Sequence, residues 1–224
     1  MTVAKNAAPD RRLILLSGLT LVSGFVDAVT FLRLGHVFVA NMTGNIVFLG
    51  FAIAGAPGIS ISGSLVALVT FLLGALLGGR LGRRHGDAHA RLLAVTTTAK
   101  IVLIGAAAAC AWIFGSEGAF FAIVALLGVS MGLQNAVVRS LGIPDMTTTV
   151  LTLTLTGIAA DSTLAGGTNT RLARRVGSVL LMFAGALIGA VLALRVGVAA
   201  ALAATAVILL LVSLAAWQLA RASA

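Results

Sequence analysis

One carboxylate and two polar interruptions stand out in a chain that is otherwise strongly apolar. Asp27 lies about 14 residues into an apolar run, which places it about 21 Å along a helix. A carboxylate at that depth in a membrane is costly, and such groups usually bind a proton or cation or pair with a buried base. The interruptions are Asn-Met-Thr-Gly-Asn at 41–45 and Thr-Thr-Thr at 147–149. Their hydroxyl and amide groups could bind a solute.

Each interruption predicts a helix that begins inside the membrane. The first N–H groups of such a helix have no partner within the helix, and in hydrocarbon they need protein, water or ligand. The partial positive charge at the helix N-terminus favours an anion or a carbonyl-rich ligand. The alternative is a re-entrant cap whose own side chains satisfy its backbone. The sequence leaves both open.

An internal repeat extends this candidate site. Residues 24–29 align with residues 132–137, which sets Asp27 opposite Asn135. Lys100 is the only basic residue at comparable depth. Asp27 could therefore titrate during transport, form an ion pair with Lys100, or bond to the backbone of a broken helix. The predicted substrate-binding residues are Asp27, Asn41, Thr43, Gly44, Asn45, Gln134, Asn135, Thr147, Thr148 and Thr149.

The composition excludes a water-soluble protein. Of the 224 residues, 60% are hydrophobic and 9% are charged, whereas soluble domains carry about 25% charged residues. The net charge of +9 does not indicate nucleic-acid binding, because the basic clusters flank apolar segments, as in cytoplasmic loops. Cys110 is the only cysteine, so a disulfide within the chain is excluded. Neither a metal nor a cofactor is expected.

Eight apolar stretches divide the chain. Six are uninterrupted and long enough for a spanning helix of about 20 residues, whereas the second and sixth contain the polar interruptions. The stretches are 13–34, 37–56, 62–80, 92–114, 118–138, 146–160, 176–194 and 197–219. They predict a multi-pass membrane protein.

The distribution of basic residues favours six crossings. If the second and sixth stretches do not cross, twelve basic residues share one side, only Arg33 and Arg195 face the other, and Lys100 stays inside. Eight crossings would divide the basic residues equally. The excess of Lys and Arg on cytoplasmic loops therefore predicts six spans with both termini in the cytoplasm. Eight full spans in parallel repeats is the alternative.

The repeat then fixes the predicted architecture. Three spans per repeat is an odd number, so the second repeat must be inverted relative to the first. The expected fold is an all-α integral membrane protein of six transmembrane helices, in two inverted three-helix repeats, each with a short discontinuous half-helix. The organisation is a cytoplasmic tail at 1–12, a first repeat at 13–114 and a second at 118–220.

Two Gly-x-x-x-Gly motifs occupy matching places in the repeats. They are Gly74–Gly78 and Gly185–Gly189, and such spacing lets two helices approach closely. The contact could lie within one chain or form a homo-oligomer. The lipid bilayer is the other expected partner.

Two motifs in the first half of the chain are distinctive: residues 24–28 (Gly-Phe-Val-Asp-Ala) and 37–45 (Val-Phe-Val-Ala-Asn-Met-Thr-Gly-Asn). Together with residues 131–136 and 147–149, they resemble the YoaK family of bacterial membrane proteins. This resemblance covers about residues 13–220. The resemblance implies predicted membrane spans and a bacterial inner-membrane location, and it implies no established substrate.

Inverted repeats with paired broken helices are typical of secondary transporters. The sequence therefore predicts a small-solute secondary transporter or permease. The solute is unknown, and the helix N-termini would accommodate an anion. A non-transporting membrane scaffold or regulatory subunit is the alternative. An enzyme is not expected, because the sequence contains neither Gly-x-Ser-x-Gly nor His-Glu-x-x-His.

Overall fold

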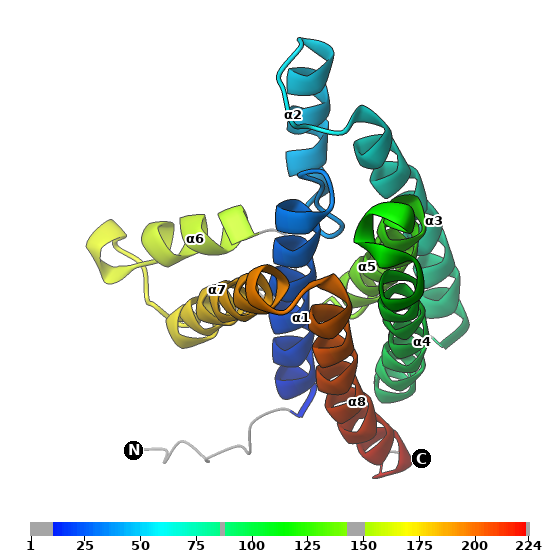
Figure 1. Ribbon diagram of the computed structural model, residues 1–224. Coiled ribbons are helices and arrows are strands. Elements are labelled where there is room, and N and C mark those ends of the chain that lie inside the picture. Colours follow the sequence, from blue (N-terminus) through cyan, green and yellow to red (C-terminus); the bar gives the residue numbers. More distant parts are fainter. Residues whose placement is uncertain (1–10, 86–87, 143–150, 223–224) are drawn as a thin grey trace, which may run out of the picture.

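The protein is all-helical wherever its structure is described. A computed structural model describes residues 11–85, 88–142 and 151–222 (Figure 1). The long helices are α1 (Arg11–Arg33), α3 (Ile61–His85), α4 (His89–Gly118), α5 (Phe120–Ser140), α7 (Leu172–Arg195) and α8 (Val198–Ala222). Within the described ranges, six helices are long and apolar enough to cross a membrane. The predicted all-α membrane class is confirmed.

Two short apolar helices and a 3₁₀ turn complete the fold. They are α2 (Met42–Ile53), α6 (Leu151–Ala160) and η1 (Thr163–Ala165). α2 begins inside the predicted interruption at 41–45, and the preceding residues 37–41 are not helical. The predicted opening of the second half-helix, at Thr147, Thr148 and Thr149, lies outside the described residues. Over the residues that the structure describes, each short helix is too short to cross a bilayer of about 30 Å alone.

The long helices form three close pairs. α1 packs against α7, α3 against α5, and α4 against α8. In the most apolar part of α1, 67% of the residues are buried, compared with 22% in α7. α5 is also largely buried, at 61%. α1 and α5 therefore supply the interior, while much of α7 is left to face lipid.

Glycines bring the paired helices into backbone contact. A Cβ added to Gly24 of α1 would lie 2.2 Å from the carbonyl oxygen of Met182 in α7. A Cβ on Gly132 of α5 would lie 2.0 Å from the carbonyl oxygen of Phe71 in α3. The Gly-x-x-x-Gly motifs form the other side of these contacts: Gly74 and Gly78 face α5, and Gly185 and Gly189 face α1. The motifs thus pack within the chain, and the homo-oligomer expected through these faces stays a prediction.

We expect Gly24→Ala and Gly132→Ala each to lower the free energy of unfolding by about 1–3 kcal/mol, the cost of overpacking a tight contact. The new methyl group meets backbone, which cannot rotate away. Gly105→Ala is the matched control, because nothing lies within 4 Å of its added Cβ. Denaturant titration of the purified variants in mild detergent measures the difference. Equal stability of Gly24→Ala and Gly105→Ala would contradict the close approach of α1 and α7.

The ends of the bundle carry unequal charge. Figure 1 shows that α1 begins, α8 ends and α3 joins α4 at the same end of the molecule. The last turn of α3 is basic, with Arg83, Arg84 and His85. At the end of α1, the Arg33 guanidinium donates a hydrogen bond to the Ala193 carbonyl near the end of α7, at 3.0 Å.

Candidate functional site

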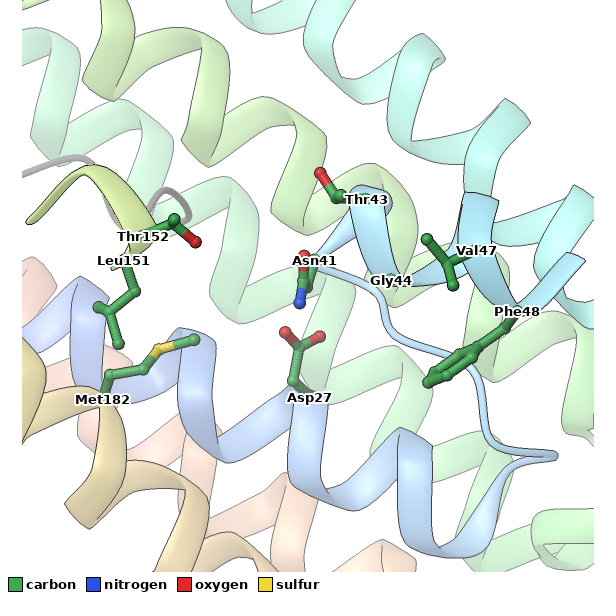
Figure 2. A pocket seen from close by; sticks show the side chains of 9 residues that line it. All are labelled: Asp27, Asn41, Thr43, Gly44, Val47, Phe48, Leu151, Thr152 and Met182. Carbon is green, nitrogen blue, oxygen red and sulfur yellow. The ribbon is translucent and has the colours of Figure 1, made fainter. Parts of the chain in front are cut away.

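A cavity of about 480 Å³ lies where α1, α2, α6 and α7 meet (Figure 2). This volume lies within the range of about 300–1,000 Å³ typical of small-molecule sites. The residues that line it are Asp27, Asn41, Thr43, Gly44, Val47, Phe48, Leu151, Thr152 and Met182. Four predicted site residues thus meet in one cavity: Asp27, Asn41, Thr43 and Gly44.

Asp27 holds the chain segment that leads into α2. Its Oδ1 atom accepts hydrogen bonds from the backbone N–H groups of Val39, at 2.9 Å, and Ala40, at 2.8 Å. The next amide, that of Asn41, also faces the carboxylate. The residue is only 5% exposed. Figure 2 shows the carboxylate pointing toward Asn41.

Asn45 fastens α2 to the same segment. Its side-chain oxygen accepts a hydrogen bond from the Phe38 N–H at 2.8 Å, and its side-chain nitrogen donates to the Phe38 carbonyl at 2.6 Å. Asn45 is fully buried. It therefore positions the start of α2 and does not line the cavity, although the sequence predicted it as a substrate-binding residue.

The N-terminus of α2 is uncapped. Asn41 occupies the N-cap position with φ −97° and ψ 80°, and its side chain makes no capping hydrogen bond. The first helical bond is accepted by Asn41 from the Asn45 N–H. In the described part of the chain, the N–H groups of Met42, Thr43 and Gly44 have no hydrogen-bond partner. Three free donors therefore sit beside the cavity.

Comparison with known proteins gives the family of the chain. The family model described as "Protein of unknown function (DUF1275)" matches residues 15–215. The chain belongs to the DUF1275 family. A relative from Bacillus subtilis (strain 168), UPF0700 transmembrane protein YoaK, is 37% identical over 150 residues. The resemblance to the YoaK family is thus confirmed, and the protein is a membrane protein of this family.

The match to YoaK is partial. It covers 66% of this DUF1275 chain and 65% of the relative, so the chain spans less than two thirds of that relative's length. No solved structure matches the chain.

Gln134 of this DUF1275 chain belongs to a different polar cluster. Lys100, which is fully buried, donates to the side-chain oxygen of Gln134 and also contacts the sulfur of Met131 at 3.7 Å. The Gln134 side-chain nitrogen donates to the Ser23 hydroxyl of α1 at 2.9 Å. Lys100 therefore pairs with Gln134, and the carboxylate of Asp27 bonds to backbone instead. Of the alternatives for Asp27, the ion pair with Lys100 is not formed.

Asn135 is not among the described residues that line the cavity. Its side-chain nitrogen donates to the Met131 carbonyl at 2.9 Å, within α5. The repeat alignment placed it opposite Asp27, yet only Asp27 meets the start of a half-helix among the described residues. Among the described residues that line the cavity, the one charged side chain, Asp27, therefore comes from the first half of the chain.

A second set of polar contacts holds α6 in the DUF1275 fold. Arg175 of α7 donates to the carbonyl of Gly157, near the end of α6, and forms an ion pair with Asp161 at 2.7 Å. A Cβ on Gly157 would lie 2.7 Å from the guanidinium carbon of Arg175. The sequence placed Arg175 only among the twelve basic residues predicted to share the cytoplasmic side. Gly157 and Arg175 are 18 positions apart, and nothing in the sequence around them indicates that they are in contact.

Five cavity residues were missing from the predicted site: Val47, Phe48, Leu151, Thr152 and Met182. Leu151 and Thr152 follow the Thr-Thr-Thr segment directly, and the hydroxyl of Thr152 is directed toward the cavity in Figure 2. The position of Thr152 next to a predicted half-helix opening could have indicated it. Met182 carries no such signal, since it is one apolar residue among many in α7.

Proposed function

We propose that this protein is a small-solute secondary transporter or permease of the bacterial inner membrane, and not an enzyme. The supporting observation is the shared cavity, which is lined by the first residues of both short helices, α2 and α6, and by Asp27. Broken helices that begin near the middle of the membrane and meet at one site are the arrangement that secondary transporters use. Free backbone donors at such a site favour a ligand, because hydrocarbon cannot satisfy them.

We propose six spans in two inverted repeats. The pairing of helices supports this. If each of the helices α1 to α4 corresponds to the helix four places later, the α1–α7 pair corresponds to the α5–α3 pair, and the α4–α8 pair corresponds to itself. The glycine contacts of the two pairs correspond in the same way. The basic end of the bundle supports a cytoplasmic location for both termini.

Cysteine labelling tests this topology. Single cysteines introduced at Arg83 and Arg91, in a variant with Cys110→Ala, should react with a membrane-impermeant maleimide only after the cells are opened. A cysteine at Glu117 is the matched control and should react in intact cells. Labelling of position 83 or 91 from outside intact cells would overturn the six-span arrangement.

Uptake into proteoliposomes tests the transport function. Reconstituted protein should take up at least one solute from a panel of amino acids, amines and carboxylates more than 10-fold faster than protein-free liposomes. A proton gradient should change that rate. Absence of uptake for every solute would favour the second candidate function, a membrane scaffold or regulatory subunit. The contacts of Asn45 and Asp27 with backbone support that candidate, because they hold α2 in place without any solute.

A further inference from the structure

Two opposite kinds of binding group lie side by side at the start of α2. One is the carboxylate of Asp27, whose oxygens can accept more hydrogen bonds than the three backbone N–H groups of residues 39–41 donate, and which attracts a cationic or N–H donor group. The other is the set of free N–H groups of Met42, Thr43 and Gly44, which attract an anionic group. Asp27 bonds to Ala40, and only Asn41 separates Ala40 from the first free donor. The two kinds of group therefore lie within the reach of one small molecule.

Packing within the protein leaves binding capacity at both groups. Asp27 is 5% exposed and lines the cavity, and the three backbone N–H groups that it binds leave part of its capacity to accept hydrogen bonds unused. Asn41 stands at the position where its side chain normally caps a helix, yet it makes no such bond and points toward the carboxylate instead (Figure 2). A carboxylate alone would repel a simple anion. Free helix donors alone would not attract a simple cation.

The rest of the cavity is suited to an apolar side group. Val47, Phe48, Leu151 and Met182 form its wall, with the hydroxyl-bearing Thr152 among them. A ligand would therefore direct its charged groups toward α1 and the start of α2, and its apolar part toward α6 and α7.

We infer that the solute is a small zwitterion that carries an ammonium group and a carboxylate on neighbouring atoms, as a neutral α-amino acid does. Its ammonium group binds the carboxylate of Asp27, and its carboxylate accepts hydrogen bonds from the N–H groups at the start of α2. This inference rests on the proposed function and names the class of solute.

Three probes of nearly equal shape test the class of ligand. L-leucine carries both charges, isopentylamine lacks the carboxylate, and 4-methylpentanoate lacks the ammonium group. We expect leucine to raise the unfolding temperature of the purified full-length protein, and each one-charge analogue to bind at least 10-fold more weakly. Binding of either analogue as tightly as leucine would overturn the inference, as would the absence of binding by leucine, alanine and glycine alike.

Two variants test which group of the protein binds each charged group of the ligand. Asp27→Asn should weaken the binding of leucine at least 10-fold. It should leave the binding of 4-methylpentanoate unchanged or make it tighter. Met42→Pro removes one free donor at a helix position that accepts proline, and Asn41 already has the non-helical backbone that must precede it. Met42→Pro should weaken the binding of leucine and leave the binding of isopentylamine unchanged. Leucine binding that neither variant alters would place the ligand elsewhere and contradict the inference.

The outcomes also separate this inference from the proposed function. Leucine binding that depends on Asp27, without uptake into proteoliposomes, would preserve the binding site and reject transport. Uptake of a different solute that does not depend on Asp27 would preserve transport and reject the zwitterion site.

Discussion

Replacing Asp27 with asparagine should reduce gradient-driven solute uptake into proteoliposomes to the level of protein-free liposomes. Asp27 is the only acidic side chain among the described residues that line the cavity, and asparagine cannot release a proton. The amide oxygen of asparagine can still accept the hydrogen bonds from Val39 and Ala40. The variant should therefore keep the segment before α2 in place and lose the coupling.

The matched control is Glu117→Gln, which makes the same chemical change at an exposed position near the end of α4 and should leave uptake unchanged. Asp27→Ala separates structure from coupling. It leaves the amides of Val39 and Ala40 without an acceptor, at a cost of about 1–3 kcal/mol for each buried group. It should lower stability as well as uptake. Gradient-driven uptake at the normal rate in Asp27→Asn would mean that the carboxylate has only a structural role.

Gln134→Leu should be among the most destabilising single substitutions in the interior. The ammonium group of Lys100 is fully buried and has Gln134 as its oxygen partner, and leucine offers no acceptor. Leaving a buried ammonium group without its acceptor costs more than leaving a neutral buried group without one, which costs about 1–3 kcal/mol. Lys100→Met should cost less, about 1–3 kcal/mol, because it leaves only the neutral amide of Gln134 unsatisfied. Denaturant titration in mild detergent measures both.

The double variant Lys100→Met with Gln134→Leu provides the decisive comparison. It replaces the polar pair with apolar side chains of similar size, so it should be more stable than Gln134→Leu alone, with a coupling of about 0.5–3 kcal/mol. Gln218→Leu makes the same change at an exposed site on α8 and should have little effect. Additive losses in the double variant would show that Lys100 and Gln134 do not stabilise each other.

Local sequence patterns predicted the elements of this fold well. A run of about 20 apolar residues can satisfy its backbone in a bilayer only as a helix, so composition and length were enough to find the six long helices. The interruption of the helix at 41–45 could also be predicted from a few neighbouring residues. Glycine and asparagine within an apolar stretch indicated a late helix start, and α2 begins there at Met42. The end of the fourth predicted stretch at 114 also fits, because Gly115 has φ 73° and interrupts α4.

The partners of the polar side chains were less predictable. Depth along a helix can be counted from sequence, so Asp27 and Lys100 were correctly expected inside the bundle. Which side chains meet depends on the rotation of each helix and on its neighbours, and contacts between residues far apart in the chain set both. Lys100 consequently meets Gln134, 34 positions away, and Asp27 meets backbone. Asn45, predicted to bind solute, turns inward to Phe38.

The sequence by itself determined that this is a helical membrane protein, where its helices run, where one of them breaks, and that one carboxylate lies deep among them. These properties follow from hydrophobicity and helix geometry, which act over a few turns of chain. Only the tertiary structure decided that Asp27, the start of α2 and the start of α6 share one cavity, and that Arg175 holds α6. Those contacts depend on how close the helices approach, and glycine-to-backbone packing between α1 and α7 sets that distance.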